Sequence, residues 1–306
     1  MNPVAVGLVL TGSVAHAAWN VLVKRVPDGG PVFVWAYSLL SLVLLVPVAV
    51  VVVLRGQVPG PAVLGASAVS AVLHLAYALA LQRAYARADM NVAYPVARGV
   101  GPVLVVLVAV VVLHERVGGL ALAGVAAVLA GVAVVASAGG PGSAGGPGSA
   151  GAPAEGVGAG APPVARRGSG ARHGVVVGAA IAAYTLWDDH AVNVLHVGVL
   201  PYYVGASALQ CALLTAVCWR RRPEAAEVLR RSWRVALAVA LLVPTSYLLV
   251  LLAMQQAPVA LVAPLRATSI VLGSLAGWLL LGERAGARRL VGAAVVLVGV
   301  AALVSP

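Results

Sequence analysis

The chain alternates between long runs of apolar residues and short stretches rich in glycine, proline or arginine. A run of about 20 apolar residues is long enough for a helix to cross the hydrocarbon core of a bilayer. The pattern therefore predicts an all-α polytopic membrane protein with ten transmembrane helices. They are expected near residues 4–23, 33–54, 62–81, 92–113 and 119–138 in the first half, and near 175–194, 201–219, 235–253, 259–281 and 290–304 in the second.

The composition agrees with a lipid environment. Apolar residues make up 61% of the 306 positions and charged residues only 9%, whereas soluble domains carry about 25% charged residues. The net charge of +11 comes from arginines in short loops between apolar runs, where basic residues set the orientation of membrane helices. This distribution excludes a water-soluble globule and gives no reason to expect a nucleic-acid partner. The expected location is the cell (plasma or inner) membrane.

A segment with almost no side chain able to pack separates the two sets of helices. It covers residues 139–172 and contains the repetitive string PGSAGGPGSAG. Ordering such a segment would cost backbone entropy that no apolar contact offsets. The sequence therefore predicts a first five-helix repeat over residues 1–138, a flexible linker over 139–172 and a second five-helix repeat over 173–306.

The two halves are related by a fixed offset of 168 residues. The offset carries Trp19 to Trp187, Arg98 to Arg266, Glu115 to Glu283, Arg116 to Arg284, Gly124 to Gly292 and Gly131 to Gly299. Because five is an odd number of crossings, the second unit must enter the membrane from the opposite side, and the repeat is inverted. Inverted repeats recur in secondary transporters, whose substrate site lies between the halves near the bilayer midplane.

Arg98 and Arg266 lie too deep in their predicted helices to be ordinary loop charges, roughly 10 Å from the helix end. One interpretation is structural, with each guanidinium reaching the membrane surface or a backbone carbonyl. The other is functional, with each arginine attracting an anionic group of a substrate or a titrating carboxylate. The neighbouring glycines and prolines favour the second, because an interrupted helix at membrane depth must face protein or a wet cavity.

Aromatic and amide side chains supply further candidates for substrate binding. Trp19 and Asn20 share one helix face, and Tyr184 and Trp187 repeat this arrangement in the second half. The alternative is that such tryptophans only belong to the aromatic belt at the membrane surface. The complete set of expected substrate-binding residues is Trp19, Asn20, Tyr77, Tyr94, Arg98, Tyr184, Trp187, Tyr247 and Arg266.

Asp188 and Asp189 are the only carboxylates that fall within a predicted span. Adjacent carboxylates in a low-dielectric site are costly to ionise together, which makes the pair a candidate for proton coupling. The alternative is that the helix ends earlier and the two residues lie in a solvated loop.

Other chemistry finds no support in the sequence. It contains no phosphate-binding loop of the Walker type, zinc-ligand spacing or nucleophile elbow. Cys211 and Cys218 share one apolar run and are interpreted as small core residues. An intramembrane enzyme built on Asp188, Asp189 and His190 is the weakest hypothesis, because no nucleophile or metal set accompanies them. We therefore expect no enzyme activity, no cofactor and no metal.

The loop charges predict an orientation. Sixteen of the 20 basic residues lie in the loops on one side, and only Arg55 and Arg116 lie in those on the other. The positive-inside rule then places the linker in the cytoplasm and both termini outside.

Several strings resemble the EamA-type drug/metabolite transporter superfamily over nearly the whole chain apart from the linker. They are HAAWNVLVKR, YPVARGVGP leading to LHER, and APLRATS leading to LGER. The resemblance implies a ten-helix carrier for small organic metabolites, commonly an exporter that exchanges its substrate for protons. It also implies a cavity lined by the first, third, fourth, sixth, eighth and ninth spans, and termini in the cytoplasm, which disagrees with the charge count. The alternative hypothesis is a membrane scaffold or sensor that transports nothing, and whether the protein is a monomer or a homodimer stays open.

Overall fold

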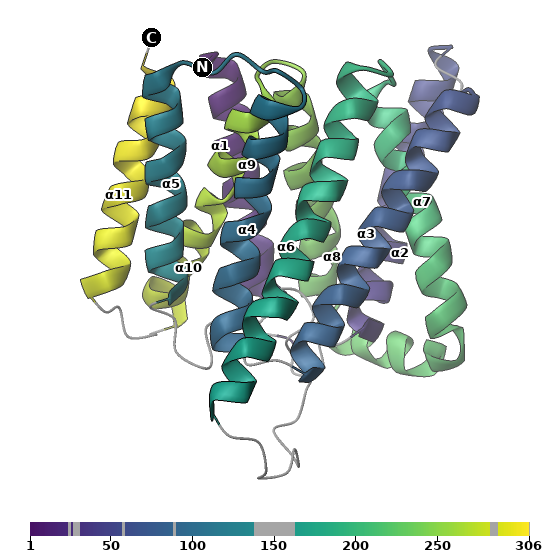
Figure 1. The fold of residues 1–306 in the computed structure, drawn as a ribbon. Helices are drawn as coiled ribbons and strands as arrows, with labels where there is room; N and C mark the ends of the chain where they lie inside the picture. The colour runs from purple at the N-terminus through teal and green to yellow at the C-terminus, as the bar shows by residue number, and fades with distance from the viewer. Residues whose placement is uncertain are drawn as a thin grey trace.

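A computed structural model describes residues 1–23, 26, 31–56, 59–87, 90–137, 163–281 and 287–305. These residues form helices and no strand (Figure 1). The helices are α1 Pro3–Val23, α2 Pro31–Leu54, α3 Pro61–Arg87, α4 Met90–Val111, α5 Gly119–Ser137, α6 Pro163–Asn193, α7 Val199–Cys218, the short 3₁₀ helix η1 Trp219–Arg221, α8 Arg222–Met254, α9 Val259–Arg266, α10 Thr268–Leu281 and α11 Ala287–Val304.

Several helices are long and apolar enough to cross a membrane. Within the described residues these are Pro3–Val23, Pro31–Leu54, Pro61–Ala84, Val199–Met254 and Val259–Ala276, of which the fourth contains two antiparallel helices. Three shorter apolar helices cover Val96–Val111, Gly119–Val135 and Leu290–Val304. The chain is thus a multi-pass helical membrane protein.

The structure departs from the predicted spans at three places. The expected single span over 259–281 is two helices, because α9 ends at Arg266 and α10 begins at Thr268. Helix α8 begins at Arg222 rather than near 235, and α6 begins at Pro163, inside the segment expected to be linker. A search for apolar runs misses these extensions, because polar residues continue a helix beyond the lipid. Residues 139–162 of the expected linker lie outside the described part of the chain.

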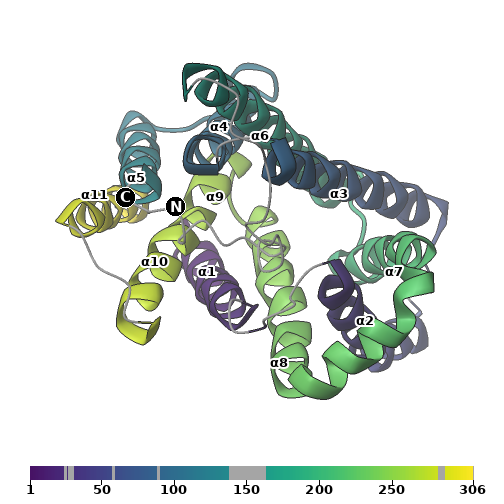
Figure 2. The ribbon, with the colours of Figure 1, turned by 90° about the horizontal axis from the view of Figure 1, so that it is seen from below.

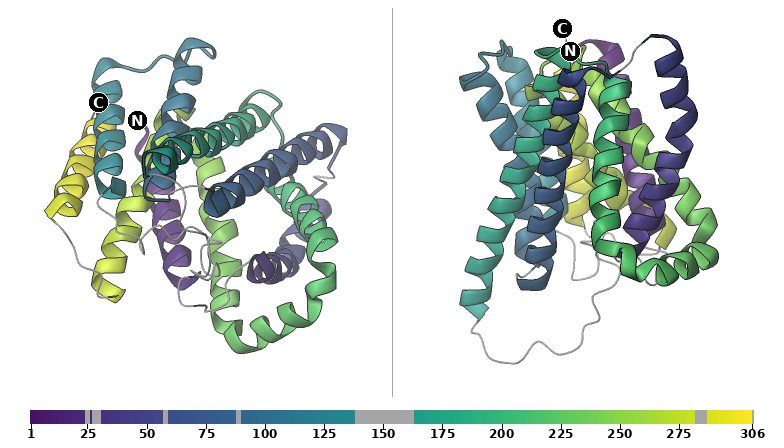
Figure 3. Two further views of the ribbon diagram at one scale, coloured as in Figure 1. Left: turned by 60° about the horizontal axis from the view of Figure 1, so that its bottom comes forward. Right: turned by 90° about the vertical axis from the view of Figure 1, so that its right-hand side faces the viewer.

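The first part of α8 carries six charged residues, which are Arg222, Glu224, Glu227, Arg230, Arg231 and Arg234. It turns across the helix ends before a kink at Ser232 directs the chain back into the bundle (Figure 3). Glu227 accepts hydrogen bonds from Arg230 and Arg231, which lower the pKa of its exposed carboxyl to about 2. Both chain termini lie at the opposite end (Figure 1). Which end faces the cytoplasm stays a prediction.

The two halves run through the molecule in opposite directions. Helix α1 begins at the end where the termini lie, whereas α6 begins at the other end (Figure 1). Seen along the bundle, α5 packs with α11 at one edge and α2 with α7 at the other (Figure 2). Helix α1 of the first half packs on α8 of the second, and the repeat-equivalent pair, α6 and α3, also pack on each other.

Glycines set the distance between α5 and α11. Gly124 faces Gly299, and Gly131 faces Gly292, so each close pair becomes the other when the halves are exchanged. A Cβ atom added at any of the four would lie 2.6–2.8 Å from the carbonyl oxygen of the facing glycine. Small residues of this kind let membrane helices approach closely. Packing, rather than turn geometry, therefore requires these glycines.

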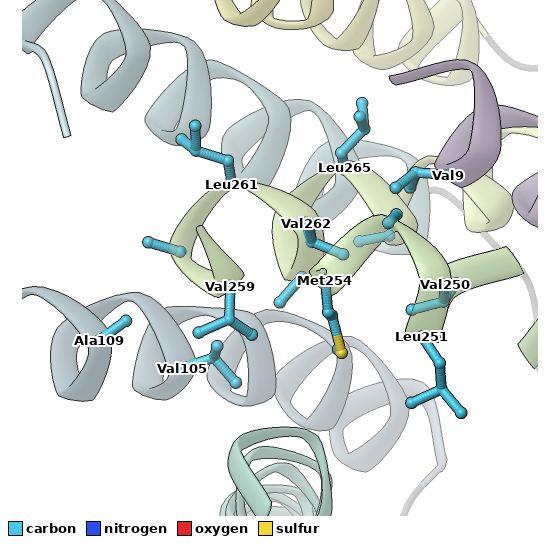
Figure 4. Packing of buried hydrophobic residues seen from close by; sticks show 14 of the residues in the cluster. Val9, Val105, Ala109, Val250, Leu251, Met254, Val259, Leu261, Val262 and Leu265 are labelled. Carbon is cyan, nitrogen blue, oxygen red and sulfur yellow. The ribbon is translucent and has the colours of Figure 1, made fainter. Parts of the chain in front are cut away.

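The short helix α9 is the meeting point of the two halves. Its residues Val259 to Leu265 are all buried, and they contact Val9 of α1, Val105 and Ala109 of α4, and Val250 to Met254 of α8 (Figure 4). Its first backbone N–H groups, those of Val259 and Ala260, both donate to the carboxylate of Glu115 at 3.0 Å. A negative charge at a helix N-terminus is stabilising. Glu115 thus ties the end of α4 to α9, while its repeat counterpart Glu283 lies outside the described residues.

We expect Gly131→Ala to destabilise the protein, because its methyl group would clash with the backbone of α11. Overpacking of this kind costs about 1–3 kcal/mol. The measurement is the thermal unfolding midpoint of the purified protein in detergent micelles. Gly7→Ala in α1 is the matched control, because a Cβ there meets no atom within 4 Å, and its midpoint should equal or exceed that of the wild type. Equal midpoints for Gly131→Ala and wild type would contradict the tight contact.

Candidate functional site

A cavity of about 230 Å³ lies between the two halves. Its walls come from α1 to α4 of the first half and α6 to α9 of the second. All six tyrosines whose side chains are described line it. Its polar and aromatic lining comprises His16, Trp19, Tyr37, Ser38, Ser41, Ser70, His74, Tyr77, Arg98, Tyr184, Tyr202, Tyr203, Ser207, Gln210, Ser246, Tyr247 and Arg266.

Stacked rings form one wall of the cavity. His74 of α3 stacks on Tyr184 of α6 with ring centroids 4.3 Å apart, and Tyr77 meets the same tyrosine edge-on at 5.5 Å. Tyr203 of α7 stacks on Tyr247 of α8 at 5.9 Å. Such arrangements suit the quadrupoles of aromatic rings and fix their orientation. The wall is therefore rigid and apolar on its ring faces.

Asp188 lies directly behind this wall with no exposed surface. Its Oδ1 accepts hydrogen bonds from the hydroxyls of Ser70 at 2.8 Å and Tyr202 at 2.5 Å, and its Oδ2 accepts one from the hydroxyl of Tyr247. A carboxylate accepts hydrogen bonds through about four lone-pair positions, and these three O–H donors occupy three of them. The donors belong to α3, α7 and α8, so this one side chain joins four helices.

His74 connects the buried carboxylate to the cavity. Its Nε2 lies 3.2 Å from the hydroxyl oxygen of Tyr247, and its Nδ1 lies 2.9 Å from the carbonyl oxygen of Ser70. The carbonyl can only accept, so Nδ1 carries the proton of this bond. The Tyr247 hydroxyl donates its one proton to Asp188, so its oxygen faces Nε2 of His74 as an acceptor, and the three groups lie in sequence from Asp188 through Tyr247 to His74.

The two arginines expected from the repeat reach the same cavity. Arg266 ends α9, and its guanidinium carbon lies 5.1 Å from the centre of the Tyr247 ring. The hydroxyl of Ser13 donates to the Arg266 carbonyl oxygen at 3.3 Å, which holds this end of α9 against α1. Arg98 and Arg266 also line a second, smaller cavity of about 50 Å³. Arg98 and Arg266 therefore line the same internal space.

The structure brings together six of the nine expected substrate-binding residues. Trp19, Tyr77, Arg98, Tyr184, Tyr247 and Arg266 all line the cavity. Asn20 instead donates to the carbonyl oxygen of His16 at 2.6 Å, and Trp187 donates to that of Ala66 at 3.0 Å. Neither is among the lining residues, because each side chain turns to a backbone acceptor. The Tyr94 side chain lies outside the described residues.

The two aspartates differ sharply in position. Helix α6 continues to Asn193, so the alternative that they lie in a solvated loop is wrong. Asp189 accepts a hydrogen bond from Asn193 at 2.8 Å, and Asn193 also donates to the carbonyl oxygen of Met254 at 2.9 Å. This group fastens the ends of α6 and α8 together and does not line the cavity. Only Asp188 is linked to cavity residues.

No motif or spacing in the sequence alone pointed to Ser70 or Tyr202 as site residues. A usable signal was present, because tyrosine is rare in this chain, with eight residues, and every one with a described side chain faces the same space. Spacing along one helix could not reveal this, since the tyrosines come from five helices.

The fold and site define a class: a multi-pass helical membrane protein with two related halves around a shared polar cavity. A model of the EamA-like transporter family matches residues 3–137 and 170–305, one match for each half. The chain therefore belongs to the EamA-like transporter family, which confirms the resemblance noted in the sequence.

One solved structure, titled only as the crystal structure of a protein, is similar to this chain. Its TM-score is 0.67, its sequence identity is 18%, and the match covers 98% of this chain and 96% of that one. At this identity the likeness concerns the fold alone. No curated protein matches the sequence closely enough to count as a relative.

We expect Tyr202→Phe to destabilise the protein, because the buried carboxylate of Asp188 loses one of its three donors. A hydrogen bond to a charged group contributes about 1.5–3 kcal/mol. Tyr203→Phe is the matched control, since this neighbouring tyrosine contributes a stacked ring rather than a bond to Asp188. Thermal unfolding in micelles should show the larger loss for Tyr202→Phe, and equal losses would contradict the role given to its hydroxyl.

Proposed function

We propose that the protein is a secondary active transporter that moves small organic metabolites across the cell membrane by alternating access. The carrying observation is the cavity lined by both halves, with the repeat-related Arg98 and Arg266 on its surface. We also propose that the chain crosses the membrane ten times. The crossings form two inverted repeats, over residues 1–138 and 173–306, with a linker between them. The direction we propose, export, rests on the family resemblance alone.

The arrangement of the helices supports alternating access. The cavity lies between elements of both halves, so a rocking of one half against the other would open it toward either side. The glycine contacts of α5 with α11 join the two halves at one edge, and we expect this edge to stay packed and serve as the hinge of such a motion. Helix α9 is buried against helices of both halves and ends at Arg266, so we expect a rocking of the halves to move Arg266 as well.

We further propose that transport is coupled to protons at Asp188. Its carboxylate is bonded to Tyr247, which is bonded to His74 on the cavity wall. A proton that reaches His74 from the cavity can pass to the Tyr247 oxygen while the tyrosine proton passes to Asp188. The carboxylate then becomes a carboxylic acid without direct exposure to water. Asp189 has no such link, so we assign coupling to Asp188 alone of the two.

Counterflow in proteoliposomes tests the transport proposal. The vesicles are loaded with a defined mixture of small organic acids, amines and sugars, and depletion is read by mass spectrometry. We expect selective depletion of one class, and a loss of at least about tenfold in rate for the Arg98→Ala, Arg266→Ala double variant, because the cavity loses both cations. Arg55→Ala, at an exposed arginine after α2, is the matched control and should keep the wild-type rate. Folded protein that depletes nothing would favour the scaffold or sensor hypothesis.

An imposed pH gradient tests the coupling. With the compound that counterflow selects, we expect the gradient to drive accumulation in the wild type and Asp188→Asn to lose nearly all of this response. Asp189→Asn removes the adjacent carboxylate, which bonds Asn193, and should keep the response. Gradient-driven accumulation that survives in Asp188→Asn would remove Asp188 from the mechanism.

A further inference from the structure

We propose that the substrate is an organic acid, a compound with an apolar body about the size of one ring and a carboxylate bound between Arg98 and Arg266. The inference rests on the proposed transport function and names the class of compound that the cavity selects. Three independent features of the cavity carry it: its fixed charges, its unused hydrogen-bond donor and its ring-lined walls.

The charges on the cavity surface are positive. Arg98 and Arg266 both line it, one from each half. The described lining residues include no aspartate or glutamate. The planar donor fork of arginine matches a carboxylate in geometry, so a carboxylate is the substrate group that two arginines on one cavity surface favour.

The Asp188 carboxylate, which is bonded to cavity residues, is not available to a cationic substrate. Asp188 has no exposed surface, and its two oxygens already accept three hydroxyl donors. An amine could reach it only by displacing Tyr202 or Tyr247, and it would do so beside Arg266, which lies over the Tyr247 ring. The loss of a tyrosine hydrogen bond and the nearby positive charge of Arg266 both disfavour the binding of an ammonium group in the cavity.

The indole N–H of Trp19 is a hydrogen-bond donor whose acceptor could come from the substrate. Its side chain is 95% buried on the cavity lining, and its indole N–H has no hydrogen-bond partner within the described chain. A buried donor without an acceptor is costly, and native structures rarely keep one without a reason. The repeat-equivalent Trp187 has its acceptor, the carbonyl oxygen of Ala66. A carboxylate oxygen of the substrate would satisfy the Trp19 N–H beside the arginines.

The rest of the cavity suits an apolar body. Tyrosine rings from both halves form its walls, and the stacked pairs present ring faces rather than charges. A volume of about 230 Å³ leaves room for one ring with a short side chain. The structure thus favours an acid with an aromatic or otherwise apolar body over a highly hydroxylated sugar.

The test compares three probes that share one skeleton: phenylacetate, the neutral phenylacetamide and the cationic phenethylamine. Binding to the full chain in lipid nanodiscs at neutral pH is measured with radiolabelled probes. We expect phenylacetate to bind at least about tenfold more tightly than either of the others. Arg266→Gln should weaken phenylacetate at least about tenfold and change phenylacetamide little, and Trp19→Phe should weaken phenylacetate by a smaller factor. The control Arg55→Gln should leave all three affinities unchanged.

Several results would overturn the inference: tighter binding of phenethylamine, equal affinity for all three probes, no binding of any probe to monodisperse protein, or phenylacetate binding that Arg266→Gln does not weaken. Different results would contradict the proposed transport function. Phenylacetate that binds as expected but never crosses proteoliposomes would leave the site intact and remove the carrier. Counterflow of amines or sugars without acids would keep the carrier and remove the acid selectivity.

Discussion

A carboxylate without exposed surface can be kept in an apolar helix bundle only where hydrogen-bond donors surround it, because its desolvation is costly. Asp188 meets this condition with hydroxyls of Ser70, Tyr202 and Tyr247. The donors come from one helix of the first half and two of the second, so the charge can be satisfied only when both halves are packed around it. The positions of Ser70, Tyr202 and Tyr247 in the cavity wall therefore depend on their hydrogen bonds to the buried Asp188 carboxylate.

The two halves are related in sequence, but equivalent positions in the site carry different side chains. The offset of 168 residues relates Asn20 to Asp188 and His16 to Tyr184, so equivalent positions carry different side chains. Even where the residue is the same, its surroundings differ, since the Trp187 N–H has a backbone acceptor and the Trp19 N–H has none among the described residues. A scaffold with two related halves therefore holds a site whose side chains differ from one half to the other.

Much of the fold could be predicted from the sequence, because apolar runs, the repeat and the odd number of helices per repeat are all local or periodic signals. The break between α9 and α10 and the charged beginning of α8 could not, since packing against neighbours and contact with water decide them. In the site, Arg98 and Arg266 stood out because charge is rare in lipid. Ser70 and Tyr202 did not, because a hydroxyl reveals its partner only when the helices are brought together in space.

The contact of α5 with α11 has a consequence beyond packing. Gly124 meets Gly299 and Gly131 meets Gly292, so the same surface is used on both sides of the contact. Contacts of this isologous kind are the ones that join identical subunits in two-fold dimers. Two separate copies of one five-helix unit, inserted in opposite directions, could make the same contact. Joining them in one chain fixes their ratio at one to one and frees each copy to acquire side chains that the other lacks.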